Sequence, residues 1–339
     1  MKQITVNGSQ QSQILIGESF KNFGKYLPTQ QVVVITDTNV RKIYGQYFEQ
    51  YPIIEIGLGE GNKNLDTVAA VIDRMLELKI DRSGFVLAVG GGIVTDVAGF
   101  VASIYQRGIG FGFVSTTLLA QVDASVGGKN GVNQKGGLKN MIGNFNQPQF
   151  VICDSQVLHS LPTYDLASGF AEIVKHTLIA DAEMFNYLEQ NAKRALSLDS
   201  EVIEKLVVNS VEIKSGVVGR DEKEKGERRK LNLGHTFGHA VEKVQKVSHG
   251  HAVSIGLAVA ARLSVMRGTL SQTDADRIVN LLRALDLPTE VTGNRAEILA
   301  AMEYDKKRIG SQINFVLMNG IGDVYIEKID IETLKQVEF

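Results

Sequence analysis

The sequence predicts an α/β domain built on a mainly parallel sheet, followed by a mostly α-helical domain. In the first half, fully apolar runs of strand length alternate with helical periodicity, as in a parallel sheet covered on both faces. Past about residue 155 helical periodicity dominates and strand signals are few. The chain, at 339 residues, is also long enough for two cores. We therefore expect domains at 1–155 and 156–339, with the active site in the cleft between them.

The elements follow from these patterns in chain order. Apolar runs predict strands at 31–37, 51–57, 84–90 and 111–117. Apolar residues repeated every three to four positions predict helices at 40–51 and 65–80, and then at 164–181, 199–221, 233–244 and 252–268.

Composition excludes several classes of protein. The 36 basic and 38 acidic residues nearly balance, which gives no electrostatic reason to expect nucleic acid or an anionic membrane as partner. The first ten residues, MKQITVNGSQ, contain no apolar run of the kind found in a signal peptide, and no apolar stretch is long enough for a membrane span. The single cysteine, Cys153, excludes an internal disulfide framework, and we expect a soluble cytoplasmic protein with this cysteine in a buried strand.

Two glycine-rich stretches are candidates for binding phosphate. In 86–100 an apolar strand runs into three glycines and the start of a helix, whose free N–H groups favour an anion. This makes the sheet Rossmann-like, although the dinucleotide pattern GxGxxG is absent, and a plain tight turn stays an alternative. In 115–143 hydroxyls, lysines and glycines lie together, as suits phosphate binding, whereas the alternative is a surface loop with solvated lysines.

Four of the six histidines lie within seventeen residues, His235, His239, His249 and His251. A metal site, an acid/base cluster and chance all stay open. The spacing of His235 and His239 matches one helical face, but Thr236 stands where the zinc-protease pattern needs Glu. A catalytic zinc takes three protein ligands, and a Glu can be one of them. Taken without a metal, Glu172 and Lys175 lie at i and i+3 of a helix, and this spacing is typical of a surface ion pair.

Several blocks together resemble the 3-dehydroquinate synthase family. In order they are GGGIVTD (90–96), TTLLAQVDASVGGK (116–129), LKNMIG (138–143), LASGFAEIVK (166–175), NLGHTFGHA (232–240) and HGHAV (249–253), and the resemblance extends to YDKKR (304–308). It implies NAD as cofactor, a divalent metal that is usually zinc with cobalt as an alternative, and a homodimer. The substrate that it implies is 3-deoxy-D-arabino-heptulosonate 7-phosphate, converted to 3-dehydroquinate and phosphate.

The resemblance also implies a role for each matched residue. The metal ligands are Glu172, His235 and His249, whereas His239 is an acid/base group and His251 is no ligand. The groups that contact the substrate are Asp123, Lys129, Asn140, Lys175, Lys214, Glu224, Arg228, Asn232 and Lys306, the last preferred over Lys307. Arg107 is the arginine that the family lends to the neighbouring subunit. The NAD-binding residues are Asp37, Asn39, Glu60, Lys63, Gly92, Ile93, Val94, Thr95, Asp96, Thr116, Thr117, Lys129, Lys139, Val157, Leu158, His159 and Ser160.

This sequence departs from the family pattern at four places, namely Thr95, Ser115, Asn130 and one additional residue between Asn133 and Lys139. None of these removes a metal ligand or a phosphate-binding charge. The alternatives to a 3-dehydroquinate synthase are another sugar phosphate cyclase, a metal-dependent NAD alcohol dehydrogenase of the glycerol dehydrogenase type, and a sensor without catalytic activity.

Overall fold

A computed structural model describes residues 1–8, 10–135, 139–293, 295–306 and 312–334 of the chain. The chain divides into two compact units. The first comprises Met1–Leu161 with Lys214–Lys223, and the second comprises Pro162–Ile213 with Glu224–Phe339.

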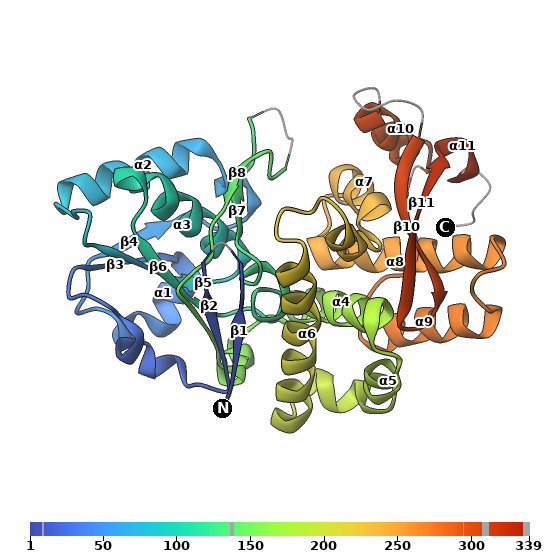
Figure 1. The fold of residues 1–339 in the computed structure, drawn as a ribbon, viewed down its shortest axis with the longest axis horizontal. Coiled ribbons are helices and arrows are strands. Elements are labelled where there is room, and N and C mark those ends of the chain that lie inside the picture. The colour runs from blue at the N-terminus through green and yellow to red at the C-terminus, as the bar shows by residue number, and fades with distance from the viewer. Residues whose placement is uncertain (9, 136–138, 294, 307–311, 335–339) are drawn as a thin grey trace. The chain divides into compact units, whose positions relative to one another are not determined.

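The first unit is built on a seven-stranded sheet in the order β1-β2-β9-β6-β5-β3-β4 (Figure 1, blue to green). The strands are β1 (Lys2–Val6), β2 (Ser12–Ile16), β3 (Val32–Asp37), β4 (Ile53–Ile56), β5 (Phe85–Gly90), β6 (Gly110–Ser115) and β9 (Phe150–Cys153). Only the β1–β2 pair is antiparallel, and every other neighbouring pair is parallel. The predicted parallel sheet is therefore confirmed, as is the buried strand position of Cys153.

Helices α1 (Thr38–Tyr44), α2 (Leu65–Glu77) and α3 (Gly92–Ile104) connect these strands. The chain passes from β3 to β4, then back across β3 to β5 and on to β6. Because crossover connections are right-handed, a helix that connects two strands in one direction along the sheet lies on the opposite face from a helix that connects strands in the other direction. Accordingly α2 packs on α3, while Val40 and Tyr44 of α1 pack against a separate core cluster on β2, β3, β5, β6 and β9. The predicted helix 40–51 is too long, because α1 ends at Tyr44 and Phe48 turns into this cluster, fully buried.

The carboxyl ends of the parallel strands lie at one edge of the sheet, where ligands of open α/β sheets bind. Helix α1 follows β3 directly there, short connections follow β5 and β6, and β9 leads into a 3-10 helix, Ser155–Ser160. The stretch 115–143 is not a plain loop. It contains a π-helical turn, Ala120–Ala124, and an antiparallel hairpin of β7 (Lys129–Val132) and β8 (Ile142–Phe145).

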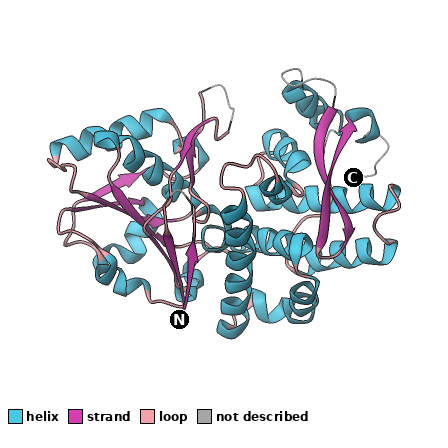
Figure 2. Ribbon diagram, in the orientation of Figure 1, coloured by secondary structure: helices cyan, strands magenta, loops and turns pink. Residues whose placement is uncertain are grey.

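The second unit is mostly helical, as predicted (Figure 2, cyan). Its helices are α4 (Thr163–Ala180), α5 (Ala182–Leu196), the first part of α6 (Ser200–Arg220), α7 (His235–Gln245), α8 (His249–Met266), α9 (Gln272–Ala284), α10 (Arg295–Lys306) and α11 (Ile331–Leu334). An antiparallel hairpin of β10 (Gln312–Gly320) and β11 (Asp323–Asp330) was not predicted. Among the described residues, no helix combines the length and the apolar character needed to span a membrane.

Three helices of this unit touch backbone to backbone at glycines. A Cβ on Gly256 of α8 would lie 1.9 Å from the carbonyl oxygen of Gly234, and one on Gly250 would lie 2.0 Å from that of Ser168 in α4. A Cβ on Gly238 of α7 would meet the carbonyl oxygen of Ala252 at 2.9 Å. Only glycine permits such approaches, and they fix α4, α7 and α8 relative to one another.

We expect Gly256→Ala to destabilise the protein by roughly 1–3 kcal/mol or more, because the added methyl meets backbone that cannot move aside alone. The measurement is the thermal unfolding midpoint. Gly216→Ala in α6 is the matched control, since its Cβ meets only the flexible end of Arg220 at 3.4 Å, and it should be neutral or stabilising. Equal midpoints for the two variants would contradict the packing argument.

Candidate metal centre and cofactor site

Glu172, His235 and His249 converge within the second unit. Each offers one ligand atom, and these atoms lie within 4.8 Å of one another. The Nε2 atoms of His235 and His249 lie 3.5 and 3.4 Å from the same carboxylate oxygen, Glu172 Oε1. Glu172 is fully buried in the middle of α4, whereas each histidine is the first residue of its helix, α7 or α8. The structure thus brings together all three ligands that the sequence resemblance implied.

Local geometry at the two helix starts directs the imidazoles. Gly234, which precedes His235, has a φ of +78°, a left-handed conformation suited to glycine. At the start of α8, the Ser248 N–H donates to the Tyr164 hydroxyl at 3.1 Å, and the Gly250 N–H donates to Ser168 Oγ at 3.0 Å. Both acceptors belong to α4, so α4 itself fixes the backbone on either side of His249.

Both histidines of this group have their other ring nitrogen at an acceptor. His235 Nδ1 lies 3.1 Å from the carbonyl oxygen of Leu233 and donates its proton there, which leaves Nε2 toward Glu172. His249 Nδ1 lies 3.5 Å from Glu242 Oε2. Metal-binding histidines commonly donate their second N–H to a carbonyl or carboxylate in this way.

Charges at the centre act differently on the two histidines. Burial and the nearby Lys175 ammonium hold the pKa of His235 well below its usual range. Burial also lowers the pKa of His249, but Glu172 and Glu242 outweigh this effect and raise it to about 9. The buried Lys175 forms an ion pair with Glu172 instead of the surface pair that its spacing suggested.

The two remaining histidines of the cluster have different surroundings. His239 is exposed, and its ring contacts that of His235 edge to face, with centroids 5.5 Å apart. His251 stacks on Tyr164 with ring centroids 4.0 Å apart, and its Nδ1 lies 2.6 Å from Ser248 Oγ. His239 therefore borders the centre, whereas His251 serves the packing of the α8 N-terminus.

Three of the substrate-contact residues expected in the second unit, Glu224, Arg228 and Asn232, lie in or near a 3-10 helix, Glu227–Asn232. Lys175 lies on α4 instead. Arg228 is buried, and the Asn232 side-chain amide donates to Glu224 Oε1 at 2.6 Å. Glu224 has a φ of +57°, which is unusual for a residue with a side chain. The side chain of Lys306 lies outside the described residues, as does the whole of Lys307.

In the first unit, several expected NAD and substrate residues form one polar network. Lys63 donates to Asp96 Oδ2 at 2.5 Å and to Asn140 Oδ1 at 2.6 Å. Burial raises the pKa of Asp96, and Lys63 opposes that rise. Lys139 lies 4.0 Å from Glu60, and this carboxylate also accepts from the Asn133 side chain at 2.7 Å.

The other expected NAD residues follow the carboxyl ends of strands. Asp37 ends β3, where its carboxylate caps α1 at the Val40 N–H, and the exposed Asn39 lies in the first turn of that helix. The Tyr44 hydroxyl of α1 donates to the Val157 carbonyl and contacts Ser160 Oγ, which ties segment 157–160 to α1. Gly92–Asp96 form the first turns of α3, whose N-cap is Gly91. Thr116 and Thr117 follow β6, and a Cβ on Gly91 would lie 2.8 Å from the Thr117 methyl.

The last group joins an acid and a lysine. Lys214 of α6 donates to both the carbonyl oxygen and Oδ1 of Asp123, each at 2.6 Å. Asp123 lies in the π-helical turn, a feature that is frequent at functional sites.

Lys129 starts β7 and is exposed. Arg107 is exposed as well, and both it and Gln106 have positive φ, 70° and 52°.

Sequence reasoning missed two residues of these sites. Glu242 lies seven positions after His235 on α7, so helical spacing alone could have placed it on the same face. Asn133 receives the Asn140 N–H at 2.9 Å and donates to Glu60, a role that no sequence signal indicates.

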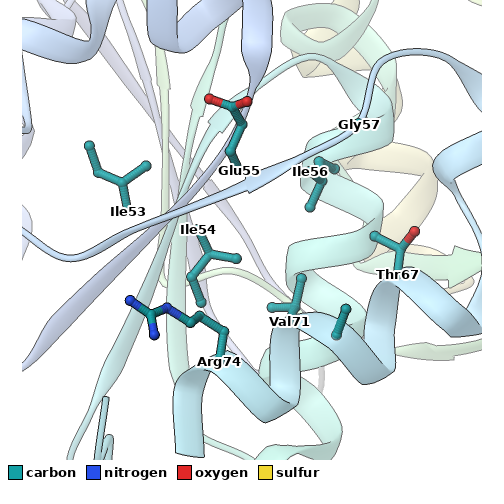
Figure 3. A pocket seen from close by; sticks show the side chains of 9 residues that line it. Ile53, Ile54, Glu55, Ile56, Gly57, Thr67, Val71 and Arg74 are labelled. Atoms are coloured by element: carbon teal, nitrogen blue, oxygen red, sulfur yellow. The ribbon is translucent and has the colours of Figure 1, made fainter. Parts of the chain in front are cut away.

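A separate hollow lies between the edge strand β4 and helix α2 (Figure 3). Ile53, Ile56, Val71 and Arg74 are among its lining residues, and none of the expected site residues lines it. It is therefore not the candidate site.

Comparison with known proteins gives consistent matches along the chain. The N-terminal model of the 3-dehydroquinate synthase family matches residues 53–168, and its C-terminal model matches residues 169–308. A 3-dehydroquinate synthase from Alkaliphilus metalliredigens is 40% identical over 337 residues, which cover 96% of this chain and 94% of the relative. One from Caulobacter vibrioides is 41% identical over 324 residues, which cover 90% and 87%.

Among solved structures, 2-epi-5-epi-valiolone synthase from Streptomyces hygroscopicus subsp. jinggangensis, with NAD⁺ and Zn²⁺ bound, has a TM-score of 0.88. It is 26% identical, and the match covers 98% of this chain and 97% of that one. This likeness confirms the predicted fold class.

The network around Lys63 yields a stability prediction. Removing one partner of a buried ion pair destabilises by roughly 3–5 kcal/mol, and since 19% of the Asp96 side chain is exposed we expect the lower end for Lys63→Met. The double variant Lys63→Met/Asp96→Asn should recover part of the loss, because no unpaired charge is left behind. Thermal unfolding of the single and double variants measures this coupling, and strictly additive losses would contradict it.

Proposed function

The chain belongs to the 3-dehydroquinate synthase family, and we propose that it converts 3-deoxy-D-arabino-heptulosonate 7-phosphate to 3-dehydroquinate and phosphate. The observation that carries this proposal is the convergence of Glu172, His235 and His249 from three helices, with the buried cation Lys175 paired to Glu172 and the buried cation Arg228 in the same unit. A substrate that has a phosphate and a carboxylate needs such cations close to its metal site.

The donor set fits a divalent cation. Two imidazole nitrogens and one carboxylate are a common ligand set of catalytic zinc, which keeps a further position open for water or substrate. The second N–H of each imidazole is directed to an oxygen acceptor, as a metal ligand requires. When bound, the metal would act as a Lewis acid toward the substrate hydroxyl oxygens.

The glycine-rich edge of the first unit fits NAD. Gly91 is the N-cap of α3 and has no side chain to cover the first amides of that helix, which suits a pyrophosphate. Asp37 and Asn39 at the end of β3 and Lys63 with Asp96 would hold the remaining polar groups. NAD⁺ supplies reversible oxidation of one substrate hydroxyl, so the net reaction is not a redox reaction.

The chain's own residues then divide the remaining work. Lys175 and Arg228 would bind the anionic groups of the substrate, and Asn232, held by Glu224, would orient it. Lys214 would hold Asp123 beside the reacting hydroxyls. His239 is exposed next to His235, so it can exchange protons with water and transfer them at the substrate. A single active site that uses the expected residues of both units stays a prediction.

A homodimer is part of the proposal. Gln106 and Arg107 adopt left-handed backbone consecutively, which costs about 1–2 kcal/mol per residue, and such strain concentrates at functional positions. The strained turn presents the exposed Arg107 to the surface, where an arginine lent to a neighbouring subunit would have to lie.

The proposal includes a cytoplasmic location. Burial raises the pKa of the only cysteine thiol, Cys153, so the thiolate is disfavoured and the residue is inert.

Among sugar phosphate cyclases, relatives of about 40% identity favour the 3-dehydroquinate synthase reaction over that of the valiolone synthase at 26%.

The proposed reaction can be tested on the purified protein with zinc, the heptulosonate phosphate and NAD⁺ at about one tenth of the substrate. We expect many phosphates released per NAD⁺, with no lasting absorbance at 340 nm, because the cofactor is regenerated. Absence of phosphate release with this substrate would refute the assignment. Stoichiometric NADH from a simple alcohol would instead indicate a dehydrogenase.

The lending of Arg107 can be tested with two inactive variants. Arg107→Ala and Lys175→Ala should each lower kcat/KM by roughly 100-fold or more, since each removes a charged contact worth up to about 3 kcal/mol. Mixing them under conditions of subunit exchange should restore activity, because the hybrid holds one site with both Lys175 and the partner's Arg107. If Arg107 acted within its own subunit, mixing would restore nothing.

A further inference from the structure

We propose that Glu242 is a positioning residue that orients the ring of His249 for metal binding. The inference deepens the proposed function, because it rests on the assignment of Glu172, His235 and His249 as ligands. Glu242 itself would contact neither metal nor substrate, and it would act through the His249 imidazole.

The three ligands differ in how firmly the fold holds them. The Glu172 side chain is fully buried and that of His235 is 11% exposed, whereas that of His249 is 32% exposed. His235 is further fixed by the carbonyl oxygen of Leu233, a backbone group that no side-chain motion can remove. Within the described part of the chain, His249 has only carboxylates at its ring nitrogens, so its ring orientation depends on other side chains.

The backbone at His249 is already fixed by α4. Tyr164 and Ser168 accept the N–H groups of Ser248 and Gly250, and Gly250 packs directly on the Ser168 carbonyl. The freedom that remains is rotation of the His249 side chain. Its ring can present either nitrogen to Glu172, and nothing in the backbone selects between them.

Glu242 supplies that selection. Its Oε2 lies 3.5 Å from His249 Nδ1, while His249 Nε2 lies 3.4 Å from Glu172 Oε1. The ring is therefore held between two carboxylates on opposite sides. Because a carboxylate only accepts, Nδ1 keeps its proton toward Glu242, and Nε2, on the side of Glu172, is the nitrogen left to bind a metal in place of its own proton. Glu242 is itself largely buried on α7, a helix packed tightly against α8.

A different role for Glu242 has to be distinguished. His239, Glu242 and His249 also offer ligand atoms within 4.8 Å of one another, so Glu242 could be a ligand of a metal placed on the α7 side. The Glu172 group is favoured, because both imidazoles aim Nε2 at one oxygen of a fully buried carboxylate, whereas His239 is exposed.

The test is cobalt binding, measured without substrate. The dissociation constant of Co²⁺ and its visible absorption spectrum are compared in the full-length wild type and in the variants Glu242→Ala, Glu242→Gln and Glu172→Gln. Glu183→Gln is the matched control, because Glu183 is an exposed carboxylate of α5 in the same unit.

We expect Glu242→Ala to weaken Co²⁺ binding about 10- to 100-fold, the range seen when groups behind metal ligands are removed. The spectrum should keep its ligand-field bands at full occupancy, since the three ligands remain. Glu242→Gln should lose less than Glu242→Ala, because its amide oxygen can still accept from Nδ1. Glu183→Gln should bind as the wild type does.

Unchanged affinity in Glu242→Ala would overturn the positioning role. A loss as large as that of Glu172→Gln, with altered bands, would also overturn it and would make Glu242 a ligand. A lower melting temperature of the metal-free Glu242→Ala protein, with unchanged Co²⁺ affinity, would show a purely structural residue. Wild-type protein that binds no Co²⁺ would instead overturn the metal site of the proposed function itself.

Discussion

The candidate metal centre depends on the direct backbone contact of α4, α7 and α8. Its ligands come from three helices, so their spacing can be no more exact than the packing of those helices. Glycines at 238, 250 and 256 remove the side chains that would otherwise separate the backbones. Contacts of this kind leave little room for adjustment, since protein interiors are packed like organic crystals. The 3.4 and 3.5 Å approaches of two imidazoles to one carboxylate oxygen follow from that rigidity.

The electrostatic field at this centre is suited to a cation. Glu172 and Glu242 place two negative charges around His249, and together they raise its pKa to about 9 although burial acts in the opposite direction. The proton held by His249 thus occupies a position where positive charge is stabilised. Metal binding would release such a proton, because a metal ligand must be the neutral imidazole. Lys175, paired with Glu172, offsets part of the negative charge, and burial together with this ammonium holds the pKa of His235 well below its usual range.

Much of this arrangement was accessible from the sequence, and what was missed has identifiable reasons. Apolar runs predicted β3 to β6, because buried parallel strands are apolar throughout. The strands β1 and β2 were missed, and β9 was expected only as the buried strand that holds Cys153, since its pairing with β2 joins remote parts of the chain. The apolar run 315–318 is visible in the sequence, and the strand β10 could have been predicted from it. The contact of Glu242 with His249 depends on the packing of α7 on α8, which no local pattern encodes.

Backbone strain supports a functional reading of residues that would otherwise pass as ordinary surface charges. Arg107, Asn140 and Glu224 all have positive φ, and the family resemblance assigns each of them to substrate contact. Left-handed backbone costs about 1–2 kcal/mol for a residue with a side chain, so surrounding contacts have to offset it. At Asn140 they do, because its N–H donates to Asn133 and its side chain accepts from Lys63. At Glu224 the carboxylate accepts from Asn232. Arg107 is exposed and follows a second residue of positive φ, Gln106, which fits the proposed contact of this arginine with a partner subunit.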